Sequence, residues 1–134
     1  MPEIKKINHV AIVVEDIDSA LGFWRDVLGL NPDHIEEVPS QASKVAFLPT
    51  GGSEVELVQP IDPESGLAKY LEKRGEGMHH LCVEVDDIEG MLAALKEKQI
   101  RLINEEPIVL PGRKMAFIHP KAANGVLVEL YELD

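Results

Sequence analysis

An internal repeat is the feature that most constrains how this chain can fold. Residues 7–17 (INHVAIVVEDI) match residues 78–88 (MHHLCVEVDDI), and the shift of 71 positions (80 minus 9) places His9 on His80. Later segments repeat at nearly the same distance, with residues 45–48 matching 115–118 and residues 55–57 matching 128–130. Two units of about 65 residues are too few for a solenoid, which needs at least three repeats. The repeat therefore predicts one domain built from two pseudo-symmetric modules.

Each module is expected to begin with a strand and to end with more strands. Residues 10–14 and 81–85 alternate and are rich in β-branched side chains, which is typical of a strand. The remaining strands are expected at residues 44–48, 54–58, 114–118 and 126–132. Each module should therefore contain one strand, one helix and then two or three strands.

A helix is predicted after the first strand of each module. Residues 19–28 and 88–98 carry apolar side chains at helical spacing, and Gly29 is expected to end the first helix. An aspartate before each helix can cap its N-terminus. The candidate caps are Asp16 or Asp18 for the first helix and Asp86 or Asp87 for the second.

We expect a single domain over residues 1–134. Module one spans about residues 4–60 and module two about residues 76–133. Residues 61–75 lie between them and include a short helical stretch near residues 67–73, which suits a linker carrying one helix.

Composition argues against several classes of function. A formal charge of -11 leaves too few clustered Lys and Arg residues for a nucleic-acid or anionic-membrane surface. No apolar run approaches the roughly 20 residues that cross a bilayer. Cys82 is the only cysteine, so no intramolecular disulfide can form, and the first residues show no secretory pattern. We therefore expect a cytoplasmic protein that binds neither nucleic acid nor a membrane.

Four polar side chains interrupt strands that are otherwise apolar. They form two repeat-related pairs, His9 with His80 and Glu56 with Glu129. A lone His in a strand is more often a satisfied core residue, and a lone strand Glu usually faces water. Two symmetric pairs favour a shared site, because two His and two Glu side chains suit a borderline divalent metal.

The other histidines are weaker candidates. His79 would be the ligand if the register slipped by one residue. The repeat favours His80, since Asn8 occupies the position equivalent to His79. His34 and His119 lie next to prolines in expected turns, where we expect them to face solvent.

Taken together, these residues resemble the vicinal-oxygen-chelate superfamily and, within it, the methylmalonyl-CoA epimerases. The segments that carry the resemblance are residues 8–14 (NHVAIVV), 55–60 (VELVQP), 68–87 (AKYLEKRGEGMHHLCVEVDD), 119–121 (HPK) and 125–130 (GVLVEL). The His and Glu spacing marks the superfamily, whereas residues 73–80 (KRGEGMHH) are more specific to the epimerases. The likeness extends over nearly the whole chain.

The resemblance implies an α+β fold in which two β-α-β-β-β modules form a cupped mixed sheet around a metal site. It implies a divalent ion, cobalt first and manganese, nickel or zinc as alternatives, held by His9, Glu56, His80 and Glu129. It further implies a homodimer that inverts the carbon between a thioester and a carboxylate of an acyl-CoA, through an enediolate that the metal stabilises. Glu129 would act both as ligand and as catalytic base.

The chain departs from the family pattern at two places. Val45 occupies the position at which some members carry a second acid or base, and residues 108–114 form a loop with fewer glycines than in many members. The basic residues expected near the CoA phosphates are Lys69, Lys73, Arg74, Arg113, Lys114 and Lys121.

Two other functions remain open at this point. A glyoxalase-type lyase or isomerase would share the metal site and the proton transfer, and a metal-free binding module would use the same fold to sequester a small molecule. A ring-cleaving dioxygenase is disfavoured, because that iron chemistry uses two His and one carboxylate, and a fourth ligand is predicted here.

Overall fold

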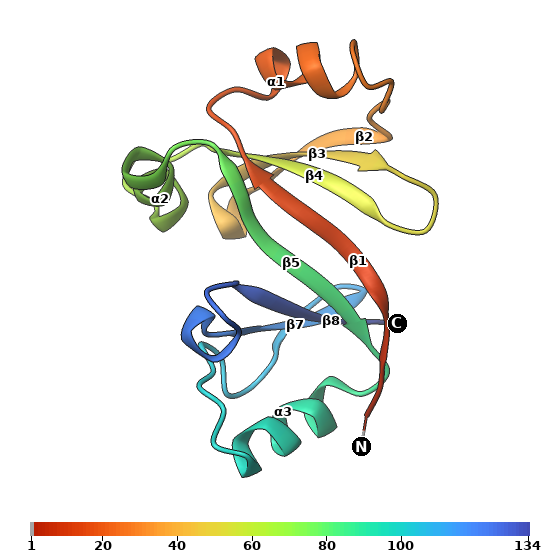
Figure 1. Ribbon diagram of the computed structural model, residues 1–134, viewed down its shortest axis with the longest axis vertical. Helices are drawn as coiled ribbons and strands as arrows, with labels where there is room; N and C mark the ends of the chain where they lie inside the picture. Colours follow the sequence, from red (N-terminus) through yellow and green to blue (C-terminus); the bar gives the residue numbers. More distant parts are fainter. Residues whose placement is uncertain (1) are drawn as a thin grey trace. The chain divides into compact units, whose positions relative to one another are not determined.

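The computed structural model describes residues 2–134, which form the order β-α-β-β-β twice (Figure 1). The first set consists of β1 (Ile4–Val13), α1 (Ile17–Trp24), β2 (His34–Val38), β3 (Ser43–Pro49) and β4 (Glu54–Pro60). The second set follows helix α2 (Gly66–Arg74) and consists of β5 (Gly77–Val85), α3 (Ile88–Glu97), β6 (Ile108–Leu110), β7 (Arg113–Ile118) and β8 (Val128–Leu133). Two short 3-10 helices, η1 (Pro39–Gln41) and η2 (Pro120–Ala122), lie in connections. The order confirms the predicted α+β class.

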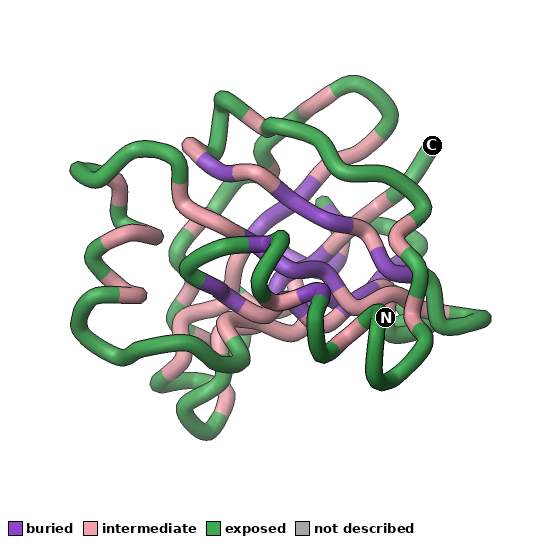
Figure 2. The backbone as a smooth tube through the Cα atoms, turned by 90° about the horizontal axis from the view of Figure 1, so that it is seen from above, coloured by how far each residue is buried: buried purple, intermediate pink, exposed green. Residues whose placement is uncertain are grey.

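The chain divides into two compact units. The first unit is Val10–His79, and the second consists of residues 2–9 with His80–Asp134. Strands β1 and β5 each contribute residues to both units. In both, the buried residues lie mainly in the strands, while the turns are mostly exposed (Figure 2).

In the first unit, helix α1 packs its apolar face on an antiparallel sheet. Strand β3 pairs antiparallel with both β2 and β4. The buried residues that form this core are Val14, Ile17, Leu21, Ala46, Leu48 and Leu57. Val45 is also buried, in a neighbouring cluster with Ala11 and Val58.

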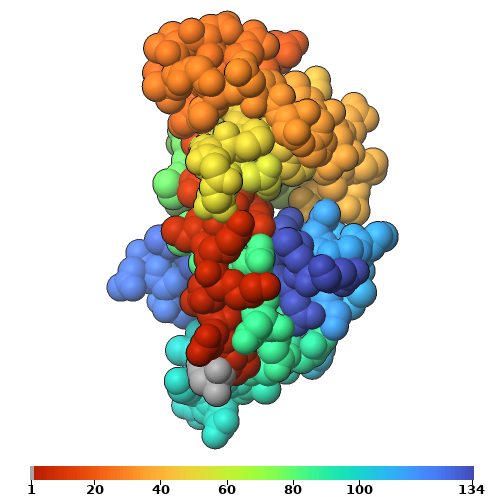
Figure 3. Space-filling view, turned by 90° about the vertical axis from the view of Figure 1, so that its right-hand side faces the viewer, coloured from red at the N-terminus to blue at the C-terminus, as the bar shows by residue number. Residues whose placement is uncertain are grey.

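The second unit has the matching arrangement around helix α3, with mixed strand pairing. Strand β5 runs parallel to β8, and β7 pairs antiparallel with both β8 and β6. The buried core residues are Val85, Ile88, Met91, Leu92, Ala116 and Leu130. The N-terminal residues, red in Figure 3, lie against the end of β5, where the Glu3 N–H donates to the Asp86 carboxylate at 2.9 Å.

Both helices begin at the predicted kind of cap. Asp16 accepts a hydrogen bond from the Ser19 N–H at 2.9 Å, and Asp87 accepts one from the Gly90 N–H at 3.0 Å. Each carboxylate satisfies an N–H group that has no partner inside its helix. Among residues 2–134, no helix is both long and apolar enough to span a bilayer.

Three elements differ from the sequence-based expectations. Helix α1 ends at Trp24 rather than near residue 28, because Val27 and Leu28 are 71% and 53% exposed and lie in turns instead of continuing the buried face. Strand β2 was expected as a turn around His34, and β6 as part of a loop. Both are short strands of mostly exposed residues, so no alternation of apolar side chains marks them.

Candidate metal centre

Three of the four predicted ligands meet inside the second unit. His9 lies on β1, His80 on β5 and Glu129 on β8. The Nε2 atoms of the two imidazoles are 3.2 Å apart. Glu129 Oε1 lies 3.3 Å from His9 Nε2 and 3.0 Å from His80 Nε2. Since His9 and Glu129 are only 1% and 3% exposed, these polar groups converge away from bulk water.

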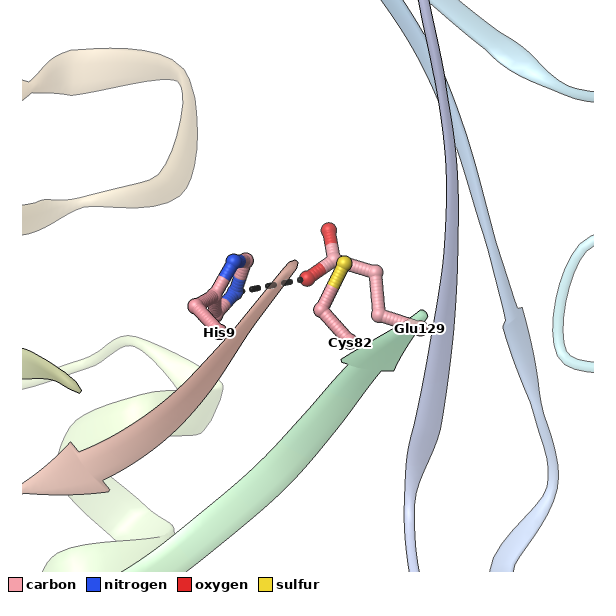
Figure 4. A group of neighbouring side chains, drawn as sticks. All are labelled: His9, Cys82 and Glu129. Atoms are coloured by element: carbon pink, nitrogen blue, oxygen red, sulfur yellow. Dashed lines mark ion pairs between the residues drawn. The ribbon is translucent and has the colours of Figure 1, made fainter. Parts of the chain in front are cut away.

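Strand register brings these side chains together and adds a sulfur that the sequence analysis did not consider. Strand β5 pairs with β8 so that Cys82 is opposite Glu129. Side chains alternate along a strand, so Cys82 shares a face of β5 with His80. Donor atoms of His9, Cys82 and Glu129 all lie within 4.8 Å of one another, and their side chains gather in Figure 4. The signal in the sequence was the two-residue spacing between His80 and Cys82.

The imidazoles control the ionisation of Glu129. Burial on its own raises the pKa of this carboxyl, but hydrogen bonds from His80 and His9, together with the charge on their rings, outweigh burial and lower the pKa. Glu129 is therefore held as a carboxylate at neutral pH. In that form it can bind a cation or accept a proton.

The spacing and chemistry of these atoms fit a divalent metal. Imidazole nitrogen and carboxylate oxygen are ligands of Zn²⁺ and of the first-row divalent ions that follow similar preferences. Two ligand atoms at about 2.1 Å from one ion lie about 3 Å apart when they subtend a right angle. The three observed separations of 3.0, 3.2 and 3.3 Å match that requirement.

Glu56, the fourth predicted ligand, belongs to the first unit. It lies on β4 opposite Phe47 of β3 and is 8% exposed. A carboxylate buried to this degree in a strand needs a compensating partner. Its role as a ligand stays a prediction.

The remaining histidines have local partners. The His79 ring meets the Tyr70 ring edge-on at 4.7 Å, and the His34 ring stacks on Phe47 at 4.3 Å. His119 Nδ1 accepts from the Lys121 N–H at 3.0 Å. Desolvation and the nearby charges of Arg101 and Lys121 lower the pKa of His119.

The basic residues expected near CoA lie on three elements. Lys69, Lys73 and Arg74 lie on α2, Arg113 and Lys114 on β7, and Lys121 in η2. Three of them already contact other side chains: Arg74 lies over the Tyr70 ring at 5.3 Å, Arg113 lies over the Tyr131 ring at 5.9 Å, and Lys114 Nζ is 2.8 Å from Glu89 Oε1. Val45, at the place of a second base, is buried and apolar, so its side chain cannot carry a proton.

A family model places this chain among known proteins. Residues 8–117 match the model of the glyoxalase/bleomycin resistance protein/dioxygenase superfamily. Human mitochondrial methylmalonyl-CoA epimerase is 39% identical over 127 residues, covering 93% of this chain and 72% of that protein. The chain belongs to the methylmalonyl-CoA epimerase family of this superfamily. It is thus an enzyme of the epimerase class.

Bacterial relatives and solved structures agree with this membership. The ethylmalonyl-CoA/methylmalonyl-CoA epimerase of Cereibacter sphaeroides is 36% identical over 133 residues, covering 97% of this chain and 99% of that protein. A structure of methylmalonyl-CoA epimerase in complex with methylmalonyl-CoA and NH4+ has a TM-score of 0.89 at 30% identity, covering 98% and 96% of the two chains. A hypothetical protein from Bacillus halodurans has a TM-score of 0.91 at 41% identity, covering 96% and 94%.

Proposed function

We propose that this enzyme interconverts (2R)- and (2S)-methylmalonyl-CoA and that it needs a divalent metal to do so. The observation that carries the proposal is the buried convergence of His9 Nε2, His80 Nε2 and Glu129 Oε1 within 3.3 Å. The substrate is taken from the family, whose relatives bear the name of methylmalonyl-CoA epimerase.

The metal ligands are His9, His80 and Glu129, with Glu56 as the fourth, and cobalt is the first candidate ahead of manganese, nickel and zinc. When bound, such an ion supplies a Lewis acid that stabilises negative charge on the thioester and carboxylate oxygens of the substrate. That charge arises because removal of the proton between the two groups leaves an enediolate.

Glu129 is the proposed carrier of this proton. Its contacts with His9 and His80 use Oε1, and the second carboxylate oxygen points away from His9 in Figure 4. One oxygen can therefore stay with the ligand set while the other faces a substrate carbon. Inversion also needs a proton delivered from the opposite face, and Val45 does not provide that donor.

The six basic residues on α2, β7 and η2 are the proposed contacts of the CoA phosphates. Three lie on α2 in the first unit and three on β7 and η2 in the second, so each unit carries its own basic group in a chain whose formal charge is -11. A local basic group is what an anionic substrate requires of an acidic protein. The homodimer stays a prediction, which light scattering of the purified protein tests.

The test follows the epimer ratio by NMR after one epimer of methylmalonyl-CoA is added to cobalt-loaded enzyme. We expect equilibration of the two epimers, loss of activity after chelation and recovery when metal is restored. Glu106→Gln is a matched control, because it removes an exposed carboxylate whose only described contact is an ion pair with Lys96 at 3.2 Å. Persistence of one epimer with metal bound contradicts the substrate assignment.

A glyoxalase-type reaction is the second candidate. A probable lactoylglutathione lyase from Synechocystis is 29% identical over 97 residues, covering 72% of each chain. The same metal-loaded enzyme is therefore offered the hemithioacetal of methylglyoxal and glutathione. Turnover of that compound alone would favour the lyase, and failure to bind any divalent metal would favour a metal-free binding module.

A further inference from the structure

A line of three polar contacts leads to His9 from the exposed side of the second unit. Lys5 Nζ lies 3.6 Å from Glu84 Oε2, and Asn8 Nδ2 donates to Glu84 Oε1 at 3.1 Å. Asn8 Oδ1 lies 2.7 Å from His9 Nδ1. Glu84 is 8% exposed and Asn8 is half-buried, so the line is largely shielded from water.

The chemistry of these groups gives the line a direction. A carboxylate only accepts hydrogen bonds, so the Asn8 group that faces Glu84 is its NH₂. The Asn8 carbonyl then faces His9 and accepts a hydrogen bond from Nδ1–H. In the neutral imidazole that a metal ligand must be, this Nδ1 proton is the only ring proton, so Nε2 then directs its lone pair toward His80 and Glu129.

The repeat does not explain this arrangement. Asn8 has His79 at the equivalent place in the second module, and Glu84 has Val13 at the equivalent place in the first. His79 instead packs against Tyr70. The two histidines of the symmetric pair therefore differ in what stands beside them.

We propose that Asn8, oriented by Glu84, is a positioning residue that selects the Nδ1–H tautomer of His9 and so presents Nε2 as a metal ligand. This inference rests on the proposed metal site and assigns a role to two residues outside the ligand set. Groups that bond the second nitrogen of a ligating His typically change metal affinity 10- to 100-fold when removed.

The first test needs no substitution. Nitrogen NMR of metal-free protein with labelled histidine reports which ring nitrogen of His9 carries the proton. We expect a proton on Nδ1, and a His9 ring that carries its proton on Nε2 alone in the wild type overturns the proposal.

The second test compares metal affinity in matched variants by competition with a chelator. Asn8→Leu should weaken cobalt binding about 10- to 100-fold and release the tautomer preference. Asn104→Leu is the control, because half-buried Asn104 accepts a single hydrogen bond of 2.9 Å from the Phe117 N–H in the same unit. We expect Asn104→Leu to lose stability but to keep the wild-type affinity.

An exchange of the two polar groups gives the sharpest check. In the double variant Asn8→Asp with Glu84→Gln, the new amide at position 84 donates to the new carboxylate at position 8. That carboxylate still accepts from His9 Nδ1–H, and the net charge of the protein is unchanged. We expect this variant to keep the tautomer and bind cobalt within about threefold of wild type, a margin well inside the loss expected for Asn8→Leu.

The outcomes separate the two proposals. If the wild type shows the expected tautomer but binds no divalent metal, the proposed function fails and the role of Asn8 in setting the tautomer stands. If the wild type binds metal and Asn8→Leu changes neither affinity nor tautomer, the role of Asn8 is wrong and the metal site stands.

Discussion

Removal of His80 should abolish most of the stabilisation that a divalent metal gives this protein. A ligand that binds only the folded state, and is present at a free concentration 100 times its Kd, stabilises that state by about 2.7 kcal/mol. Unfolding entropy of about 2.1 cal/mol/K per residue over 134 residues amounts to about 0.28 kcal/mol/K, so wild-type Tm should rise by about 10 °C.

The structure indicates how far this shift should fall in His80→Ala. His80 Nε2 is one of three donor atoms within 3.3 Å of one another, and its loss leaves a pair. If affinity drops about 100-fold, the same metal concentration equals the new Kd and stabilises by only about 0.4 kcal/mol. The expected Tm rise is then about 1.5 °C.

Differential scanning calorimetry with and without cobalt measures both shifts, each against the metal-free form of the same protein. His34→Ala is the matched control, because exposed His34 stacks on Phe47 in the first unit and is not a proposed ligand. It should keep the wild-type shift. An undiminished shift in His80→Ala would refute the reasoning that this imidazole binds the metal.

Two further predictions concern the scaffold. Leu21→Ala and Leu92→Ala each truncate a buried helix residue, 1% and 2% exposed, at equivalent places in the two modules. Each should lower the free energy of unfolding, measured in urea, by about 2–5 kcal/mol. A negligible loss at either position would show that its helix contributes little to the core. Asp16→Asn keeps a capping acceptor but removes the charge. Hydrogen bonds from the Ser19 N–H and then from its hydroxyl lower the pKa of Asp16 below its ordinary value, so the stabilisation is present above that ordinary value and is lost as pH falls through the folded pKa. The variant should be less stable at pH 7 and equal to wild type in acid, and a difference independent of pH would contradict this.

Much of the fold could be predicted because the repeat carries strong local signals. Alternating strands in residues 10–14 and 81–85, and an aspartate before each helix, are decided by neighbours in the chain. Asp16 and Asp87 are the caps that the structure shows. The edge strands β2 and β6 were not predicted, because most of their residues are exposed and no alternation of apolar and polar side chains marks them in the sequence.

The candidate site was predictable to the level of residue type but not of contacts. Repeat symmetry was enough to select His9, His80 and Glu129, which the structure brings together. The placement of Cys82 opposite Glu129 depends on the register between β5 and β8. The Asn8–Glu84 hydrogen bond joins residues 76 positions apart, and such pairing leaves no local pattern in the sequence.

Deuterium incorporation at the α-carbon tests the central claim most directly. One epimer of methylmalonyl-CoA is incubated with cobalt-loaded enzyme in deuterated water, and mass spectrometry follows the α-position in wild type and in Glu129→Gln. The account predicts deuterium uptake that accompanies inversion in the wild type and is lost in Glu129→Gln, since the amide cannot accept the proton. Inversion without uptake, or uptake undiminished in Glu129→Gln, would contradict proton transfer by Glu129.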